Sequence, residues 1–190
     1  HRLQYLAYST ASNDLVWTSL PASLQGVTTT SNFLLGEDPT GGASYNSSSA
    51  INNTSLGKGA LGVITTSNDS TAIGFNSLSS QTIGNQNTAV GSSTLKHATS
   101  GNSNTAMGYH AGDAITTGDF NTVIGDDAGS GVSTGDQNTA IGYKALMTED
   151  GNGKNTAIGS FALNVQNAGA DGFNTAIGTS AGVSVTTGIE

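Results

Sequence analysis

Residues 138–142 read NTAIG, and near copies of this pentapeptide recur along most of the 190-residue chain. With the closing glycine as the origin, the first seven copies are 17 residues apart and the last step is 19. Repetition at a fixed step indicates an architecture in which each copy forms one structural unit. The origin glycines are Gly57, Gly74, Gly91, Gly108, Gly125, Gly142, Gly159 and Gly178.

Each position of the repeat has its own character. The residue three before the origin is always Thr, and the residue four before it is Asn except at Ser70. The positions two before and three after the origin are small, whereas the position just before it is always apolar. We expect this apolar column to form the structural core of the coil, with each copy shielding the next. The predicted core residues are Leu56, Ile73, Val90, Met107, Ile124, Ile141, Ile158 and Ile177.

The composition of the repeat favours strands over helices. Gly, Asn and Thr are poor helix formers, and no 3.6-residue period is visible. Two turn clusters with Thr, Ile and Val between them leave room for two or three short strands per copy. If each copy is one coil, equivalent residues stack roughly 4.8 Å apart and form ladders along the axis. The sequence therefore predicts an all-β, parallel β-solenoid with 17-residue coils.

A single chain with so few large apolar residues would be only marginally stable. Burying an Ile side chain gives roughly 2–3 kcal/mol, whereas ordering the backbone of each residue costs roughly 1–2 kcal/mol. The small-residue columns suggest close approach of a second surface. We therefore expect the chain to pair with itself as a homo-oligomer.

The repeat also carries a family resemblance. NTAIG, two variable residues, Ala-Gly or Ala-Leu, then TTG and Asn resembles the repeats of trimeric phage and virion tail fibres. It is similar to the head repeats of YadA-like trimeric autotransporter adhesins, which use an NSVAIG-type motif. The resemblance covers about residues 53–190. It implies a left-handed β-roll or β-helix, a homotrimer around one axis, and a role in host attachment and cell adhesion.

One feature departs from the YadA-like pattern. The step of 17 residues is longer than the usual coil of those heads, which favours the fibre branch. It leaves a three-sided coil of about 18 residues, as in hexapeptide helices, as an alternative cross-section.

The ends of the chain differ from the repeats. Residues 1–31 contain two apolar runs around a turn cluster and predict a β-hairpin connector. Residues 32–52 include Asn32-Phe33-Leu34-Leu35-Gly36, a degenerate pentapeptide typical of an atypical capping coil. The solenoid repeats then occupy residues 53–190 and stop within a repeat, so we expect the solenoid to be truncated at the C-terminus.

The net charge and the apolar content of the chain exclude two classes of partner, nucleic acid and the membrane interior. A formal net charge of −8 with five Lys plus Arg cannot provide the basic surface that nucleic acid requires. No run approaches the roughly 20 apolar residues of a membrane helix, so membrane insertion is not expected. The absence of Cys suits a virion or an extracellular, cell-surface location.

Little in the sequence predicts catalysis. The three His residues and the scattered carboxylates match no motif that carries a mechanism, so we expect neither an enzyme nor a cofactor. His97 and His110 fall in different columns and are not expected to meet. Asp119 and Asp136 share a column, with Asp126 and Asp127 near them, and these four are weak calcium candidates. The repeat lacks the G-G-x-G-x-D motif of calcium-binding β-rolls. Acidic residues are also common in turns that bind no metal.

The two positions after the origin vary freely, as an exposed surface does. Exposed rings beside polar groups can stack on sugars or contact a protein receptor. They can equally pack on a neighbouring chain, because scattered apolar residues are normal on protein surfaces. The receptor-contact candidates are Phe75, Tyr109, His110, Tyr143 and Lys144.

The function expected from these patterns is structural and adhesive. The chain would be a trimeric tail-fibre or surface-adhesin module whose partner is a cell-surface glycan or protein. One alternative is a monomeric β-solenoid that binds a regular surface such as ice, which would require two aligned Thr columns on one strand. Another is a glycan-binding or glycan-hydrolysing fibre domain, although no residue supports hydrolysis.

Overall fold

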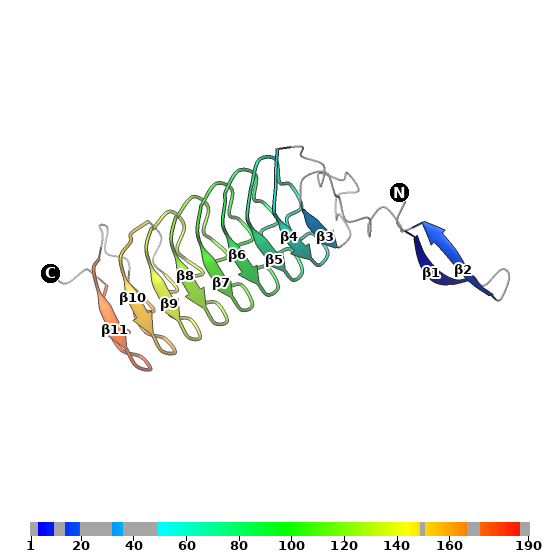
Figure 1. Cartoon of the computed structure of the whole chain (residues 1–190). Helices are drawn as coiled ribbons and strands as arrows, with labels where there is room; N and C mark the ends of the chain where they lie inside the picture. The colour runs from blue at the N-terminus through cyan, green and yellow to red at the C-terminus, as the bar shows by residue number, and fades with distance from the viewer. Residues whose placement is uncertain are drawn as a thin grey trace.

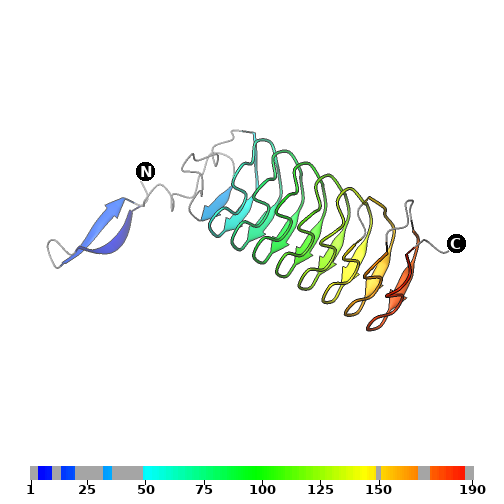
Figure 2. The ribbon, with the colours of Figure 1, turned by 180° about the vertical axis from the view of Figure 1, so that it is seen from behind.

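The chain folds into a parallel β-solenoid (Figure 1). The computed structural model describes residues 4–9, 14–19, 32–35, 49–148, 151–166 and 172–186. Within these ranges the regular structure is entirely β, with no helix. Nine parallel strands lie side by side in chain order, and Figure 2 shows the same stack from behind. The predicted fold class is confirmed at this level.

Each coil contributes one short strand that begins at the Thr of the pentapeptide. The strands pair in register, so that Thr122 lies opposite Thr139 and Ile124 opposite Ile141. The 19-residue step keeps this register, with Thr156 opposite Thr175. The strands are β3 (Phe33–Leu35), β4 (Thr54–Leu56), β5 (Thr71–Ile73), β6 (Thr88–Val90), β7 (Thr105–Met107), β8 (Thr122–Ile124), β9 (Thr139–Ile141), β10 (Thr156–Ile158) and β11 (Thr175–Ile177).

The N-terminal segments follow the sequence predictions where they are described. β1 (Gln4–Ser9) and β2 (Asp14–Ser19) pair antiparallel and form the expected hairpin. β3 pairs in parallel with β4, so that the degenerate pentapeptide enters the stack as its first rung. Residues 36–48 of the expected capping coil lie outside the described residues.

Backbone hydrogen bonds also join the coils outside the strands. In the turn after the buried residue Gln81, Thr82 N donates to Thr99 O at 3.0 Å. The hydroxyl of Thr82 donates to the same carbonyl. At the start of the strand, Thr122 N donates to Asn138 O at 2.8 Å. The coils are therefore hydrogen-bonded to one another at several points around each coil, and these bonds fix the distance between neighbouring coils along the axis.

Left-handed backbone conformations shape the coil. In the coil of Gly74, φ is 56° at Asp69, 53° at Asn76 and 48° at Leu78. The equivalent positions repeat these values in the other described coils. Such conformations cost non-glycine residues roughly 1–2 kcal/mol each, so the stacked hydrogen bonds must hold them in place. The sequence did not reveal them, because the columns that hold Asp69 and Asn76 are occupied by Phe120 and Lys144 in other coils.

The core of a single chain is built from the small residues. Ala89, Ala106 and Ala140, two before their origins, are fully buried. The small column three after the origin, which includes Ala111 and Ala145, is also fully buried except at Ala181 in the last coil. The prediction that small residues mark the approach of another chain is therefore wrong, because these residues lie inside their own coil.

Larger side chains fill the remaining interior in a compensating pattern. Leu95, four after its origin, is buried, and the residue three later is the small Ala98. In the next coil Gly112 replaces the Leu and Ile115 replaces the Ala. A Cβ on Gly112 would lie 3.0 Å from Ile115 Cδ1, so the isoleucine occupies the space that the glycine leaves. The volume of the core is thus conserved between these two coils, whereas the coil of Gly57 buries both Leu61 and Ile64.

A buried ladder of asparagine side chains runs along the stack. Asn121 donates from Nδ2 to Gly135 O at 2.8 Å and to Asn104 Oδ1 at 3.0 Å. Its Oδ1 accepts the backbone N–H of Asn138 at 2.9 Å. Each amide therefore satisfies backbone groups that the coil would otherwise bury unpaired. The members of this asparagine ladder are Asn32, Asn53, Asn87, Asn104, Asn121, Asn138, Asn155 and Asn174.

At Ser70 the ladder lacks its amide, and Gln81 supplies one from the interior. Gln81 Nε2 donates to Ser70 Oγ at 2.9 Å, to Gly84 O at 2.8 Å and to the hydroxyl of Ser67. Its Oε1 accepts from Asn87 Nδ2 at 3.0 Å. A longer side chain from another part of the coil thus replaces the missing asparagine.

This pairing predicts a rescue. We expect Gln81→Ala to lower the free energy of unfolding by about 2–3 kcal/mol, because buried polar groups lose their partners. Ser70→Asn added to Gln81→Ala should recover at least half of that loss, since the coil with Asn87 and Ala98 has this combination naturally. Urea titrations of the single and double variants measure the coupling. If the added asparagine recovers nothing, Gln81 does not substitute for the missing amide.

Candidate functional site

The outer face of the sheet carries two parallel columns of side chains. Within a strand such as Thr139-Ala140-Ile141, side chains alternate, so that Thr139 and Ile141 face outward while Ala140 is fully buried. We call the outward apolar column the apolar stripe. Its members are Leu56, Ile73, Val90, Met107, Ile124, Ile141, Ile158 and Ile177.

The prediction that the apolar stripe forms the core of the coil is wrong for a single chain. None of its residues is buried, and Leu56, Met107 and Ile177 are 50%, 49% and 68% exposed. The physical reason is the alternation itself, because the invariant Thr and the apolar residue share one side of the strand. The narrow interior takes the Ala between them. A continuous apolar column is therefore left on the outside of the stack.

The receptor-contact candidates lie at the turn just after each strand. Phe75, Tyr109 and Tyr143 are 51%, 54% and 43% exposed. Tyr109 stacks on His110 with ring centroids 4.1 Å apart, and Lys144 Nζ lies 5.2 Å from the centre of the Tyr143 ring. Four of the five candidates thus form two contacts between sequence neighbours, Tyr109 with His110 and Tyr143 with Lys144.

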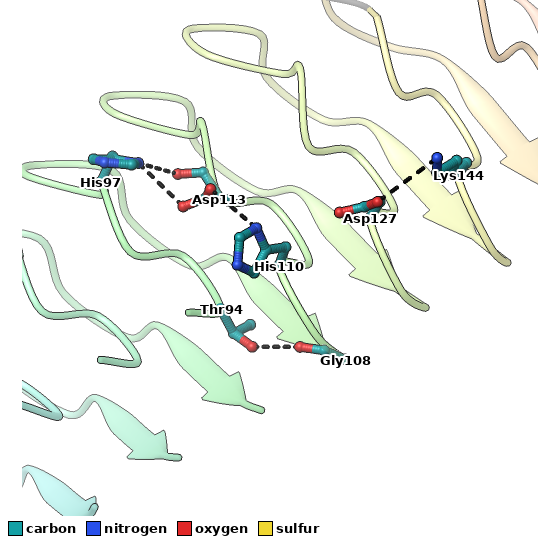
Figure 3. A network of polar contacts seen from close by, with 7 residues as sticks. All are labelled: Thr94, His97, Gly108, His110, Asp113, Asp127 and Lys144. Carbon is teal, nitrogen blue, oxygen red and sulfur yellow. Dashed lines mark hydrogen bonds and ion pairs between the residues drawn. The ribbon is translucent and has the colours of Figure 1, made fainter. Parts of the chain in front are cut away.

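Two histidines converge on one carboxylate, contrary to the expectation that they stay apart (Figure 3). His97 Nδ1 lies 3.1 Å from Asp113 Oδ1 and 2.9 Å from Asp113 O. His110 Nδ1 lies 3.5 Å from Asp113 Oδ2. Different columns meet here because Asp113 follows His110 by three residues and stacks against the coil of His97. Sequence columns alone could not show this, since it depends on where the turn side chains point.

The calcium candidates divide into two places. Asp119 Oδ1 accepts the backbone N–H of Asn102 at 2.6 Å, and Asp136 Oδ1 accepts that of Asp119 at 2.7 Å. These two carboxylates therefore extend an outer ladder of turn residues. Asp127 lies beside Lys144 instead, with 4.0 Å between Oδ2 and Nζ, and it follows Asp126 at the other turn. Within the described ranges no three acidic, His or Cys residues form a metal-binding group.

The stacking of the Asn column was expected, but sequence reasoning missed its burial against backbone groups and the outward direction of the apolar stripe. The sequence did contain a signal for the outward direction of the apolar stripe, because residues two apart on a strand share a face and the invariant Thr lies two residues before each apolar residue. In comparisons with protein-family models, curated proteins and solved structures, the chain gives no match. Over the part of the chain that the structure describes, no helix is long and apolar enough to cross a membrane.

Proposed function

We propose that the chain is a segment of a homotrimeric attachment fibre in which the apolar stripe is the interface between copies. The observation that carries this proposal is the continuous column of exposed Leu, Met, Val and Ile side chains on the outer sheet face. Contiguous exposed apolar surface on a folded protein marks interaction sites. A second copy has an identical column with an identical rise.

The regular rise of the stack favours parallel association. Copies that point the same way around one axis bring equivalent residues of the stripe together at every coil, because each coil advances by the same strand spacing. Rotational symmetry also closes the assembly, which prevents further growth sideways. Three copies of a left-handed β-roll are what the resemblance to tail fibres and YadA-like heads implies.

Such an assembly suits attachment at a virion tail or a bacterial surface. Coils joined at several points around the section resist bending and leave few free backbone groups inside the stack. Variable turn residues are then displayed in three copies, so weak contacts gain through effective concentration.

The ice-binding alternative predicts two Thr columns on one strand. The strands read Thr-Ala-Ile and its variants, so the second outward column is apolar throughout the described repeats. No specific observation favours that alternative.

Sedimentation equilibrium tests the assembly. We expect the native chain to sediment at three times its 18.9 kDa mass. The variant Ile124→Asp/Ile141→Asp should sediment as one chain, because two charges would have to be buried in the apolar interface.

A matched control adds the same charge away from the stripe. Thr117 and Gln137 are exposed in neighbouring coils, and Thr117→Asp/Gln137→Asp should keep the native mass. A native chain that sediments as one copy at micromolar concentration would refute the proposal.

A further inference from the structure

The position just after the origin glycine alternates between rings and small polar residues. From Phe75 to Ser160 aromatic rings occur at every second coil, and the residues between them are Ser or Asp; the column begins with Lys58 and ends with Thr179. The three rings are among the exposed large side chains of the protein. We call Phe75, Tyr109 and Tyr143 the ring row. In chain order the column reads Phe75, Ser92, Tyr109, Asp126, Tyr143 and Ser160.

Backbone hydrogen bonds keep this column in register. The carbonyl of each member accepts an N–H from the next coil: Tyr109 O accepts from Asp127 at 3.0 Å, and Tyr143 O from Phe161 at 2.9 Å. Adjacent rungs are therefore one strand spacing apart, and successive rings are two spacings apart, or roughly 9.5 Å. The three rings span four coil steps in a straight line along the stack.

Neighbouring side chains hold two of the three rings, Tyr109 and Tyr143, in place. Tyr109 stacks on His110, and Tyr143 meets Phe161 edge to face with centroids 5.2 Å apart. Tyr109 and Tyr143 are thus oriented, partly exposed aromatic rings, and Phe75 is 51% exposed. Rings held in this way lose little conformational entropy when a ligand binds.

The spacing matches an extended sugar chain. In a β-1,4-linked polysaccharide each pyranose advances by close to one strand spacing, and successive sugars face opposite ways. Every second sugar therefore presents the same apolar C–H face, which can stack on an aromatic ring. The hydroxyl of Ser92 and the carboxylate of Asp126 lie at the intervening rungs, where they can hydrogen-bond sugar hydroxyls.

The charge of the protein favours neutral over anionic polysaccharides. The net charge is −8, and Asp126 and Asp127 lie on the coil between Tyr109 and Tyr143; Lys144, 4.0 Å from Asp127, offsets one of these two carboxylates and leaves the other. An anionic polysaccharide would be repelled along this surface, whereas a neutral one would not.

We propose that the ring row binds one neutral, extended, β-1,4-linked polysaccharide laid parallel to the solenoid axis, one sugar per coil. This inference rests on the proposed attachment function and names its partner. Phe75, Tyr109 and Tyr143 contact the first, third and fifth sugars of the bound stretch.

Chain length is the first test, measured by isothermal titration calorimetry with the full chain. The probes are β-1,4-linked oligomers of glucose, of mannose and of N-acetylglucosamine, from two to six sugars. For at least one series, affinity should rise roughly three- to tenfold from two to three sugars and again from four to five, when a further ring is reached. The step from three to four should add little. Binding of none of the three series, or a smooth rise with length, would overturn the proposal.

A register swap provides the matched control. Ser92→Tyr/Tyr109→Ser keeps the number of rings and the composition but breaks the two-coil spacing. We expect it to remove the step between two and three sugars and to weaken hexamer binding roughly tenfold. Unchanged binding by the swap variant would show that spacing does not matter. A curved α-1,4-linked glucose hexamer should not bind the native protein.

Sedimentation equilibrium of the same samples separates this inference from the proposed function. A native chain that sediments as a single copy yet binds with the stepped length dependence would refute the trimer and keep the ring row. A trimer that binds no oligomer would refute the ring row alone. If Phe75→Ser/Tyr109→Ser/Tyr143→Ser dissociates the trimer, the rings belong to the interface between copies, and the glycan proposal is wrong.

Discussion

Gly125→Ala is expected to lower the free energy of unfolding by roughly 3–5 kcal/mol, because one methyl group would separate two coils. A Cβ at this position would lie 2.6 Å from the carbonyl oxygen of Gly142 and 2.7 Å from its carbonyl carbon. The φ of Gly125 is 132°, which L residues rarely adopt. Gly125 N also donates to Met107 O at 2.8 Å, so the backbone is held against the movement that would relieve the clash.

Thermal and urea unfolding, compared at equal chain concentration, measure this loss. Gly151→Ala is the matched control, since the nearest atom to its added Cβ is Thr134 Oγ1 at 3.3 Å. We expect that control to change stability by less than about 0.5 kcal/mol. Equal effects of the two substitutions would mean that the origin glycines do not set the spacing of the coils.

Asn121→Ala should be comparably damaging, with a loss of roughly 3–5 kcal/mol. The substitution leaves Gly135 O and the backbone N–H of Asn138 without the amide that satisfies them. Asn121 is fully buried, so water cannot replace it without opening the coil. Removing one partner of a buried polar network costs the full desolvation of the groups left behind.

The control for this prediction uses the outer ladder. Asn102 is only partly buried, yet its Nδ2 donates to Ser100 O at 3.0 Å and its Oδ1 accepts Asn85 N at 2.9 Å. Asn102→Ala should cost about 1 kcal/mol, because water can reach the groups it leaves. Unfolding in urea compares the two variants, and an equal loss would contradict the role given to burial.

The arrangement of the coils could be predicted from the sequence. A fixed step with invariant Thr and Gly requires equivalent residues to stack, and the parallel register of Thr122 on Thr139 is what that stacking produces. The parallel direction of the strands, the 17-residue coil and the all-β class follow from repetition alone. Each copy has nearly the same sequence as its neighbours and therefore packs in the same way.

The faces of the coil could not be predicted in the same way. A three-residue strand offers two sides, and hydrophobicity alone placed Ile141 inside and Ala140 against another chain. The structure places Ala140 inside and Ile141 on the outer face, because Thr139 and Ile141 share a side and the coil interior is filled by residues such as Leu146. Each coil has three left-handed residues, and no single residue type marks them, since Gly112 and Leu146 adopt this conformation in the same column.

The meeting of His97 and His110 at Asp113 was also beyond sequence reasoning. It depends on the directions of turn side chains rather than on column numbers. Turn positions of this kind are where a repeat can vary without disturbing its stack, so their geometry has to be observed.

The central claim is that other copies of the chain cover the apolar stripe, and thiol labelling of single-cysteine variants tests it most directly. The chain has no cysteine, so Ile141→Cys on the stripe and Gln137→Cys on the exposed turn each give one reactive site. In the native assembly we expect the thiol at position 141 to react at least about tenfold more slowly than the thiol at 137, and to lose this protection on dilution to single chains. Equal rates for the two thiols at high protein concentration would contradict the account.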